Sequence, residues 1–286
     1  MRRIGVIARQ DRPDAPEVVQ SLTRWLGARG LEVVADGPTA ALAAGAGLPV
    51  VERAELPRRV DLIVVLGGDG TLLAVARLVD GLDVPLLGVN LGGLGFLTAT
   101  TLEALYPTLE KVLRGEYAAE ARMVLAVQLV RDGVTVAEHL ALNDAVIAKG
   151  ALGRLIALDV RMDGQPMTAY RADGLIIATP TGSTAYNLSA AGPILFPTME
   201  AMVLTPICSH TLTNRPIVLP GTAVLEITLL SDAPDVVLSV DGQGGRAVTA
   251  EDVLRVGRAP ACLRLIRDPE KTYFQVLRTK LKWGER

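Results

Sequence analysis

An uninterrupted apolar run that ends in glycines and one carboxylate limits the fold of this chain more than any other stretch. Leu62 to Leu66 is entirely aliphatic and leads into Gly67-Gly68-Asp69-Gly70-Thr71. A strand without polar alternation is typical of a parallel sheet that is covered on both faces, and Leu72 to Val79 has helical spacing. The sequence therefore predicts a strand, a tight glycine turn and a helix in succession.

The carboxylate in this turn has two interpretations. Glycines let backbone N–H groups approach a phosphate, and the start of a helix adds partial positive charge. Asp69 would repel that phosphate unless a divalent cation bridges them or the carboxylate takes a proton from a hydroxyl that is being phosphorylated. Alternatively, Asp69 only caps the helix and the glycines only close the turn. The motif alone leaves both interpretations open.

Strands and helices alternate over the first 115 residues. Strands are expected within residues 1–9 and at 31–35, 62–66 and 84–90, and helices at 15–29, 72–79 and 101–113. Such alternation implies a mostly parallel sheet with helices on both faces and ligands beyond the carboxyl ends of the strands. Asn90 to Thr98 is a second glycine turn at that end, although it fails the dinucleotide-binding pattern, and no Gly-Lys pair exists for a Walker A motif.

From Arg122 onward the pattern changes to short strands separated by turn signals. Asp132-Gly133 and Asp163-Gly164 mark hairpins. The strands are expected at 124–131, 134–141, 155–162, 167–171, 223–230, 236–240 and 263–266. These ranges predict a second domain that is largely antiparallel.

The predicted fold is therefore α/β with two domains, as a length of 286 residues also favours. Residues 1–115 would form a Rossmann-like parallel α/β domain, and residues 116–267 a β-rich, largely antiparallel domain. Tyr273 to Leu281 has spacing that suits a strand or a helix. We expect this C-terminal segment, 268–286, to rejoin the first domain.

Composition excludes several classes of function. A net charge of −2 gives no basic field for nucleic acid. No apolar stretch approaches membrane-spanning length without interruption, and the apolar part of the N-terminus is too short for a signal peptide. We therefore expect a cytoplasmic protein that binds neither nucleic acid nor membrane. Cys208 and Cys262 lack metal-ligand spacing and are expected to be buried.

A dense group of hydroxyls follows the predicted strand that precedes Thr179. The segment reads Thr179-Pro180-Thr181-Gly182-Ser183-Thr184-Ala185-Tyr186, and a helix is expected to begin near Ala185. Capping that helix requires one hydroxyl rather than four. The others would bond a polyhydroxylated or phosphorylated ligand, and Tyr186 would stack on it or bond a ribose.

Two further acidic turns occur in the β-rich part. Asn143-Asp144 follows one predicted strand and precedes another, which favours a carboxylate aimed at the vicinal hydroxyls of a ribose over an ordinary turn. Asp241-Gly242-Gln243 shares the same ambiguity.

Together these segments resemble the NAD kinase family over nearly the whole chain. The family's Gly-Gly-Asp-Gly-Thr motif matches residues 67–71, its Asn-Leu-Gly-x-Leu-Gly-Phe-Leu segment matches 90–97, and its Thr-Pro-Thr-Gly-Ser-Thr-Ala-Tyr signature matches 179–186. Phosphofructokinases and the lipid kinases of diacylglycerol and sphingosine share only the first of these. The family usually has Asn-Glu where this chain has Asn143-Asp144, so the carboxylate sits on a shorter arm.

The resemblance implies ATP-dependent phosphorylation of NAD at the adenosine 2′-hydroxyl to give NADP. Asp69 would orient or deprotonate that hydroxyl, and Mg²⁺ would be bound mainly through ATP, with Asp69 as the one candidate protein ligand. The alternatives are a lipid or sugar kinase on the same fold and a non-catalytic dinucleotide sensor. A lipid kinase would need an apolar entry surface or a basic patch, and no such charge cluster stands out.

The resemblance also implies the remaining site residues and a homodimer or homotetramer. Asn143 and Asp144 would hold ribose, and the other residues expected to contact nucleotide are Gly70, Phe96, Arg154, Arg171, Asp173, Thr184, Ala185, Tyr186, Asn187, Leu188, Ser189, Asp241 and Gln243.

Overall fold

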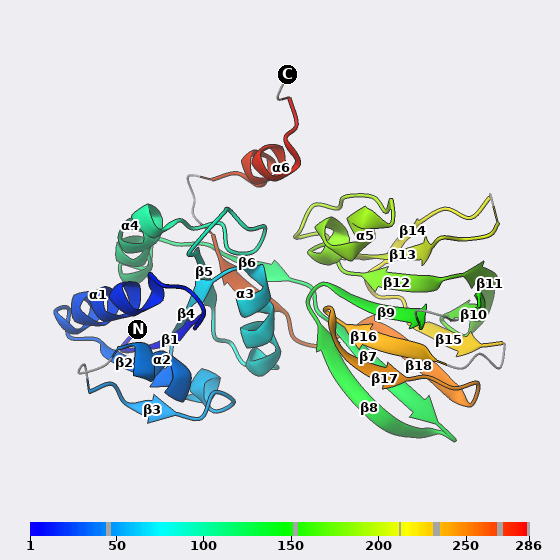
Figure 1. Cartoon of the computed structure of the whole chain (residues 1–286), viewed down its shortest axis with the longest axis horizontal. Helices are drawn as coiled ribbons and strands as arrows, with labels where there is room; N and C mark the ends of the chain where they lie inside the picture. The colour runs from blue at the N-terminus through cyan, green and yellow to red at the C-terminus, as the bar shows by residue number, and fades with distance from the viewer. Residues whose placement is uncertain (44–46, 151–153, 212, 231–234, 268–270, 285–286) are drawn as a thin grey trace. The chain divides into compact units, whose positions relative to one another are not determined.

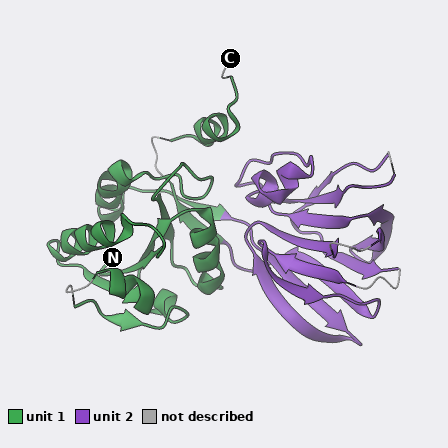
Figure 2. Cartoon of the chain, viewed as in Figure 1, with its two compact units in different colours: residues 1–121, 263–286 green, residues 122–262 purple. Residues whose placement is uncertain are grey.

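The computed structural model describes residues 1–43, 47–150, 154–211, 213–230, 235–267 and 271–284 (Figure 1). The chain divides into two compact units (Figure 2). Unit 1 comprises residues 1–121 and 263–286, and unit 2 comprises 122–262. The α/β class with one parallel and one antiparallel part is confirmed. The assignment of NAD binding to residues 116–267 stays a prediction.

Unit 1 is built on one seven-stranded sheet. Its order is β3 (Val50–Val51), β2 (Glu32–Asp36), β1 (Arg3–Ala8), β4 (Leu62–Gly67), β5 (Leu86–Asn90), β19 (Leu263–Ile266) and β6 (Ala119–Arg122). Neighbouring strands from β3 to β19 are parallel. Because β1 leads to β2 on one side while β4 lies on its other side, the order of the strands reverses between β1 and β4.

Helices cover both faces of this sheet, as the unbroken burial of β4 requires. The helices of unit 1 are α1 (Ala15–Gly27), α2 (Gly37–Leu42), α3 (Asp69–Ala76), α4 (Leu102–Leu113) and α6 (Tyr273–Leu281), with short 3₁₀ turns at Leu56–Arg59 and Arg77–Val79. The apolar faces of α1 and α4 share a core with Val64 and Val89. On the opposite face, Leu72 of α3 lies against Gly88, where a Cβ atom would overlap it.

The structure corrects the expectation for one C-terminal segment and decides between two alternatives for another. Leu263–Ile266 was expected in the second domain, but it pairs in parallel with β5, with Leu265 opposite Leu86. A four-residue apolar strand fits any buried sheet, so its period cannot tell which sheet it joins. Tyr273–Leu281 is a helix, since Thr272 and Gln275 form a capping box at its start.

Unit 2 consists of two six-stranded antiparallel sheets that share one apolar core. The first has the order β11 (Gln165–Ala172), β10 (Ile156–Met162), β15 (Leu225–Leu229), β18 (Asp252–Arg258), β7 (Leu125–Arg131) and β8 (Val134–Ala141). The second has the order β14 (Ile217–Pro220), β13 (Ala201–Ile207), β12 (Gly174–Ala178), β9 (Asp144–Lys149), β16 (Val236–Val240) and β17 (Gln243–Ala247).

Both predicted hairpins of unit 2 are present. Asp132-Gly133 joins β7 to β8 and Asp163-Gly164 joins β10 to β11, and all four residues have positive φ. Two successive left-handed residues make the turn that matches the twist of the flanking strands.

The cysteine prediction is wrong, because Cys208 and Cys262 are both exposed as free thiols. Within the described ranges, no helix is long and apolar enough to cross a membrane.

Candidate active site

A cavity of about 370 Å³ lies at the carboxyl ends of the central strands of unit 1. It is lined by Arg9, Arg12, Gly67, Gly68, Asp69, Asn90, Leu91, Gly92, Gly93, Leu94, Gly95 and Lys280. Apart from Lys280 of α6, these residues end or follow β1, β4 and β5, so the cavity includes the place where the strand order reverses. Open α/β sheets bind their ligands at that place, because neighbouring loops diverge there.

Asp69 does not cap the helix that it begins. The capping position of α3 is Gly68, and no side chain bonds to it. Instead, the Asp69 carboxylate accepts hydrogen bonds from the backbone N–H groups of Phe96 (2.8 Å), Leu97 (3.1 Å) and Thr98 (2.9 Å). The capping interpretation is therefore wrong, and the second glycine turn holds the carboxylate of the first.

A side-chain relay completes this arrangement. The Thr98 hydroxyl donates to Asp69 Oδ1 (2.9 Å) and accepts from Asn90 Nδ2 (2.9 Å), while Asn90 Oδ1 accepts from the N–H of Gly92 (2.6 Å). Thr98 and Asn90 are both buried. A Cβ atom on Gly95 would overlap the Asp69 carboxylate, so only glycine permits this close approach.

Thr98→Val is expected to lower turnover by about tenfold, because it leaves Asn90 Nδ2 without its acceptor and removes one of the three hydrogen bonds to Asp69 Oδ1 while preserving side-chain shape. Thr98→Ser keeps the hydroxyl and should retain most of the activity. Steady-state kinetics of both purified variants checks this, and equal losses in the two would show that loss of the hydroxyl does not by itself explain the effect.

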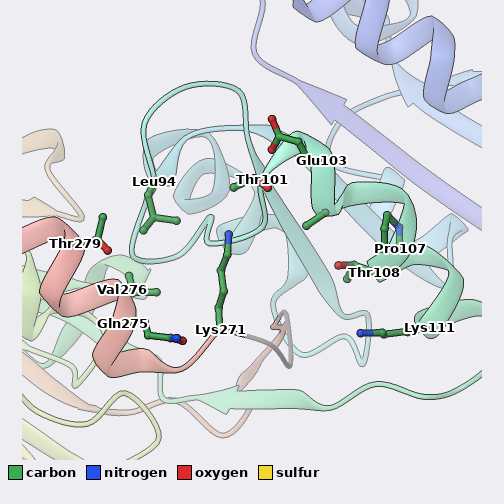
Figure 3. A pocket seen from close by; sticks show the side chains of 11 residues that line it. Leu94, Thr101, Glu103, Pro107, Thr108, Lys111, Lys271, Gln275, Val276 and Thr279 are labelled. Atoms are coloured by element: carbon green, nitrogen blue, oxygen red, sulfur yellow. The ribbon is translucent and has the colours of Figure 1, made fainter.

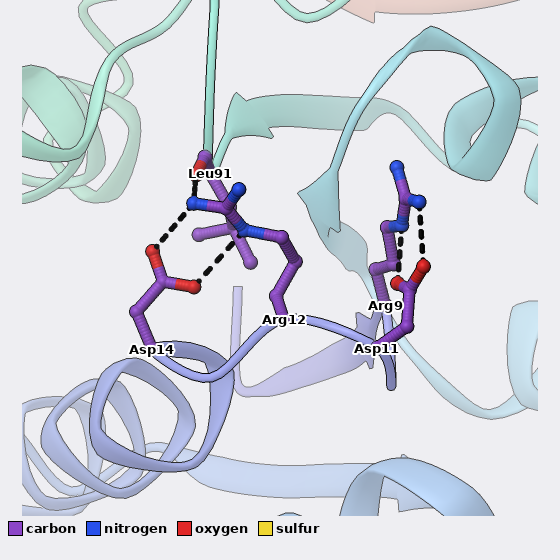
Figure 4. Close-up of polar contacts among 5 residues, drawn as sticks. All are labelled: Arg9, Asp11, Arg12, Asp14 and Leu91. Atoms are coloured by element: carbon purple, nitrogen blue, oxygen red, sulfur yellow. Dashed lines mark hydrogen bonds and ion pairs between the residues drawn. The ribbon is translucent and has the colours of Figure 1, made fainter.

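Three cations line the same cavity, and the sequence reasoning missed all of them. Arg9 pairs with Asp11, while Arg12 pairs with Asp14 and donates to the Leu91 carbonyl oxygen (Figure 4). Lys280 reaches the cavity from α6. The available signal was positional, since Arg9 and Arg12 directly follow a predicted strand whose carboxyl end faces the ligand side.

A second cavity in unit 1, of about 700 Å³, lies between α4 and α6 (Figure 3). Lys271 crosses it, donating to the Ala99 carbonyl oxygen (3.2 Å). None of the predicted site residues lines it, although Leu94 lines both cavities. Its size alone assigns it no function.

In unit 2, the Asn143-Asp144 turn is held by Asp241. The Asp241 carboxylate accepts hydrogen bonds from the N–H groups of Leu142 (3.1 Å), Asn143 (2.7 Å) and Asp144 (3.1 Å). In return, the Asp241 N–H donates to the Asp144 carbonyl oxygen (2.9 Å). Asp241 and Gly242 both have positive φ and form the tight turn from β16 to β17, which places Asp241 there.

The Asp144 side chain is only 4% exposed. Burial, together with the negative charge of Asp241, raises the pKa of Asp144 to about 7. A buried carboxyl group whose pKa is raised to near neutrality is typical of a functional position.

The hydroxyl-rich turn packs directly on this acidic turn. The Thr179 N–H donates to the Asn143 carbonyl oxygen (2.8 Å), and the Thr179 hydroxyl donates to the Leu142 carbonyl oxygen (2.6 Å). A Cβ atom on Gly182 would overlap Asn143, so this glycine permits the contact. The structure thereby brings together Asn143, Asp144, Asp241 and the turn that leads to Thr184.

The four hydroxyls of that turn all have protein partners. Besides Thr179, the Ser183 hydroxyl donates to the Pro180 carbonyl oxygen (2.6 Å), Thr181 accepts from Arg122 (3.3 Å), and Thr184 donates to the Thr181 carbonyl oxygen (3.3 Å). The hydroxyl density therefore has a structural cause and is no evidence of its own for a ligand.

The remaining predicted residues of unit 2 differ in placement. Tyr186–Ser189 forms the short helix α5, in which the Tyr186 side chain is exposed and Asn187 is buried. Asp173 pairs with Lys149 (3.0 Å) at the opposite end of the β9–β12 pair, about 16 Å along the strand from Asp144. Arg154, Arg171 and Gln243 are exposed.

Comparisons with known proteins agree with this arrangement. Residues 4–117 match the model of the ATP-NAD kinase N-terminal domain, and residues 142–268 match that of the ATP-NAD kinase C-terminal domain. The NAD kinase of Syntrophotalea carbinolica is 51% identical over 286 residues, and that of Geotalea daltonii is 50% identical over 286 residues, with 100% of each chain covered in both cases.

Solved structures give the same result. The fold is similar to that of yeast NADH kinase complexed with NADH, with a TM-score of 0.93 and 26% identity over 100% of this chain and 89% of that chain. An Archaeoglobus fulgidus NAD kinase in complex with ATP matches with a TM-score of 0.77 and 23% identity over 98% of each chain, which supports the fold. The chain therefore belongs to the ATP-NAD kinase family and is a phosphotransferase that phosphorylates NAD with ATP.

Proposed function

We propose that the reaction transfers the γ-phosphoryl group of ATP to the adenosine 2′-hydroxyl of NAD, with Asp69 as the group that orients and deprotonates that hydroxyl. The observation that carries this proposal is the position of Asp69, a carboxylate between two glycine turns in a cavity whose other described charged lining residues are the cations Arg9, Arg12 and Lys280. Phosphoryl transfer depends mainly on positioning and on charge stabilisation, and these residue types supply both.

The triphosphate is proposed to bind along Arg9, Arg12 and Lys280. Guanidinium groups form paired hydrogen bonds with phosphate, and the start of α3 adds partial positive charge. A phosphate that binds Arg9 and Arg12 would compete with their present partners, Asp11 and Asp14, and would release those carboxylates to solvent.

Asp69 would act through the carboxylate oxygen that now accepts the fewer hydrogen bonds. Its Oδ2 accepts one hydrogen bond, from Phe96, whereas Oδ1 accepts three. A carboxylate oxygen can accept more than one hydrogen bond, so Oδ2 is the atom proposed to receive the proton of the attacking hydroxyl. The bonds to Oδ1 would keep the side chain in place during the transfer.

A divalent cation, with Mg²⁺ as the expected ion, is proposed to bind through the phosphates of ATP. Across the described part of the chain, no three His, Cys, Asp or Glu side chains gather closely enough to hold a metal ion. The donor set therefore fits an ion held by the triphosphate, with Asp69 as the one carboxylate among the described residues that line the cavity. Such an ion would screen the charge of the phosphates.

NAD is proposed to bind residues on both ends of the β9–β12 pair. Asn143 and Asp144 would hold a ribose, and the other contacts expected in unit 2 are Arg154, Arg171, Asp173, Thr184, Ala185, Tyr186, Asn187, Leu188, Ser189 and Gln243. Within unit 1, the expected contacts are Gly70 and Phe96. An extended dinucleotide suits two groups of residues separated along a strand, and the exposed ring of Tyr186 is available for stacking.

NAD that lacks the adenosine 2′-hydroxyl is expected to bind but to yield no phosphorylated product with ATP and Mg²⁺. The attacking oxygen must lie in line with the γ-phosphorus and within hydrogen-bond reach of Asp69, so a neighbouring hydroxyl cannot substitute. The measurement is NADP formation from NAD in a coupled assay, with phosphorus NMR on the analogue reaction. Phosphate at any other position of either compound would contradict the assignment.

The alternative functions, the cellular location and the oligomeric state can be considered beside this proposal. The comparisons lend no support to a lipid or sugar kinase or to a non-catalytic sensor. Two exposed free thiols suit a reducing compartment, which is consistent with a cytoplasmic location. We also infer a homodimer or homotetramer, since Ile217 and Val218 of β14 are 37% and 46% exposed on the last described strand of its sheet.

A further inference from the structure

We propose that Asp241 is a positioning residue for NAD binding: its carboxylate fixes the backbone of residues 142–144 and thereby the place of the Asp144 carboxylate. This inference rests on the proposed function, in which Asp144 holds a ribose of NAD. It changes the role expected for Asp241, which the sequence placed among the residues that contact nucleotide directly.

The contacts of Asp241 carry the argument. Its Oδ1 accepts from the N–H groups of Asn143 (2.7 Å) and Asp144 (3.1 Å), and its Oδ2 accepts from Leu142 (3.1 Å). The side chain is only 7% exposed. Both carboxylate oxygens are thus engaged with backbone that is 97 to 99 residues away in sequence. The Asp241 carboxylate therefore fixes the backbone of residues 142–144 and presents little surface to a ligand.

Two backbone hydrogen bonds also hold the turn that the Asp241 carboxylate fixes. The Asp144 carbonyl oxygen accepts from the Asp241 N–H (2.9 Å), and the Asn143 carbonyl oxygen accepts from the Thr179 N–H (2.8 Å). Removing the Asp241 carboxylate would leave three N–H groups unpaired in a buried place, so the turn would shift to satisfy them. The Asp144 carboxylate would move with its own backbone.

Asp241 also acts on Asp144 through charge. Asp144 is flanked by Ala178 on β12 and by Asp241 after β16, and Asp241 is the titratable group that faces it. Burial and this neighbouring charge raise the pKa of Asp144 to about 7. If the ionised form accepts the ribose hydroxyls, NAD affinity rises as the pH increases through about 7. Replacing Asp241 by a neutral residue would move that rise to lower pH.

Asp241→Asn is the informative variant, because asparagine tolerates the φ of 50° at this position and keeps one oxygen for the N–H groups. We expect NAD binding about 3- to 10-fold weaker at alkaline pH, and a midpoint of the affinity–pH curve lower by about half a unit or more. Asp144→Asn should bind NAD about as weakly at every pH as the unmodified protein does at acid pH, and should therefore show no midpoint. Equilibrium dissociation constants for NAD alone, without ATP, give these quantities.

Two controls make the result decisive. Asp132→Asn changes an aspartate at the same position of an Asp-Gly turn, with φ 51°, and should leave both affinity and midpoint unchanged. In the Asp144→Asn background, Asp241→Asn should cause little further loss, since it acts through Asp144. Thermal melts of each variant confirm that it is folded.

An unchanged midpoint of the affinity–pH curve in Asp241→Asn would overturn the proposal, because Asp241 would then have no effect on Asp144. A full additional loss of NAD affinity in the double variant would also overturn it, because Asp241 would then act on NAD independently of Asp144. NADP formation by the unmodified protein is measured in parallel. If the unmodified protein forms NADP but the midpoint of the affinity–pH curve does not shift in Asp241→Asn, only the positioning role of Asp241 is wrong. If the unmodified protein forms no NADP, the proposed function is wrong, and the NAD dissociation constants still test the role of Asp241.

Discussion

Asp69→Asn is expected to lower kcat by roughly 10²–10⁴-fold, the range for loss of a general base. The amide cannot take a proton from the attacking hydroxyl, and its NH₂ group would face one of the backbone N–H groups that the carboxylate now accepts. The fold should survive, because the change is isosteric and lies at the start of an eight-residue helix. Initial rates of NADP formation give the magnitude.

The matched control for this experiment is Asp132→Asn, an exposed aspartate in a hairpin of unit 2. It should retain full activity. NAD binding to Asp69→Asn should remain within a few-fold of normal, since the proposed role of Asp69 lies in the transfer step. Near-normal turnover in folded Asp69→Asn would leave the carboxylate only its structural role of holding the second glycine turn.

Asp144→Asn is expected to stabilise the protein at alkaline pH. The folded chain keeps the Asp144 proton up to a pKa of about 7, whereas an unfolded chain loses it near 3.8. Stability of the unmodified protein therefore falls as pH rises through this window, and the penalty is complete above pH about 7. The neutral amide avoids this penalty, so the free energy of unfolding should rise by about 4 kcal/mol at most.

Urea unfolding at several pH values measures this gain. The free energy of unfolding of Asp144→Asn should exceed that of the unmodified protein above pH about 7, and the two should converge below pH about 4. A gain of equal size at both ends of the range would mean that packing, rather than the charge of Asp144, accounts for it.

Local sequence signals predicted the elements of this fold well. The aliphatic run at Leu62 could only be a doubly covered strand, and the two Asp-Gly pairs specified their hairpins because few residue pairs adopt positive φ twice. The Leu263–Ile266 strand was misplaced because pairing partners are set by the whole topology. The cysteines were misplaced because residue type gives only an average tendency for burial.

Site chemistry was predictable only in part. Asp69 and Asp241 were found because carboxylates beside glycines are conspicuous, and Asp144 was found because an Asn-Asp pair interrupts two predicted strands. Their partners were not found, since Thr98 lies 29 residues from Asp69, and Leu142 lies 99 residues from Asp241. The hydroxyls from Thr179 to Thr184 have protein partners that the sequence did not predict, because sequence alone cannot show that a turn uses its own side chains to satisfy its backbone; their ligand role stays a prediction.

The two clamped carboxylates bear on how this site can change over evolutionary time. Asp69 and Asp241 each accept hydrogen bonds from three consecutive backbone N–H groups, those of 96–98 and 142–144. Every amino acid except proline has a backbone N–H, so the side chains of these segments can be substituted while the hydrogen bonds to the carboxylate are kept. The positions of Asp69 and Asp241 are thus fixed mainly by the backbone conformation of these two segments. A comparison of their side chains alone would not detect this.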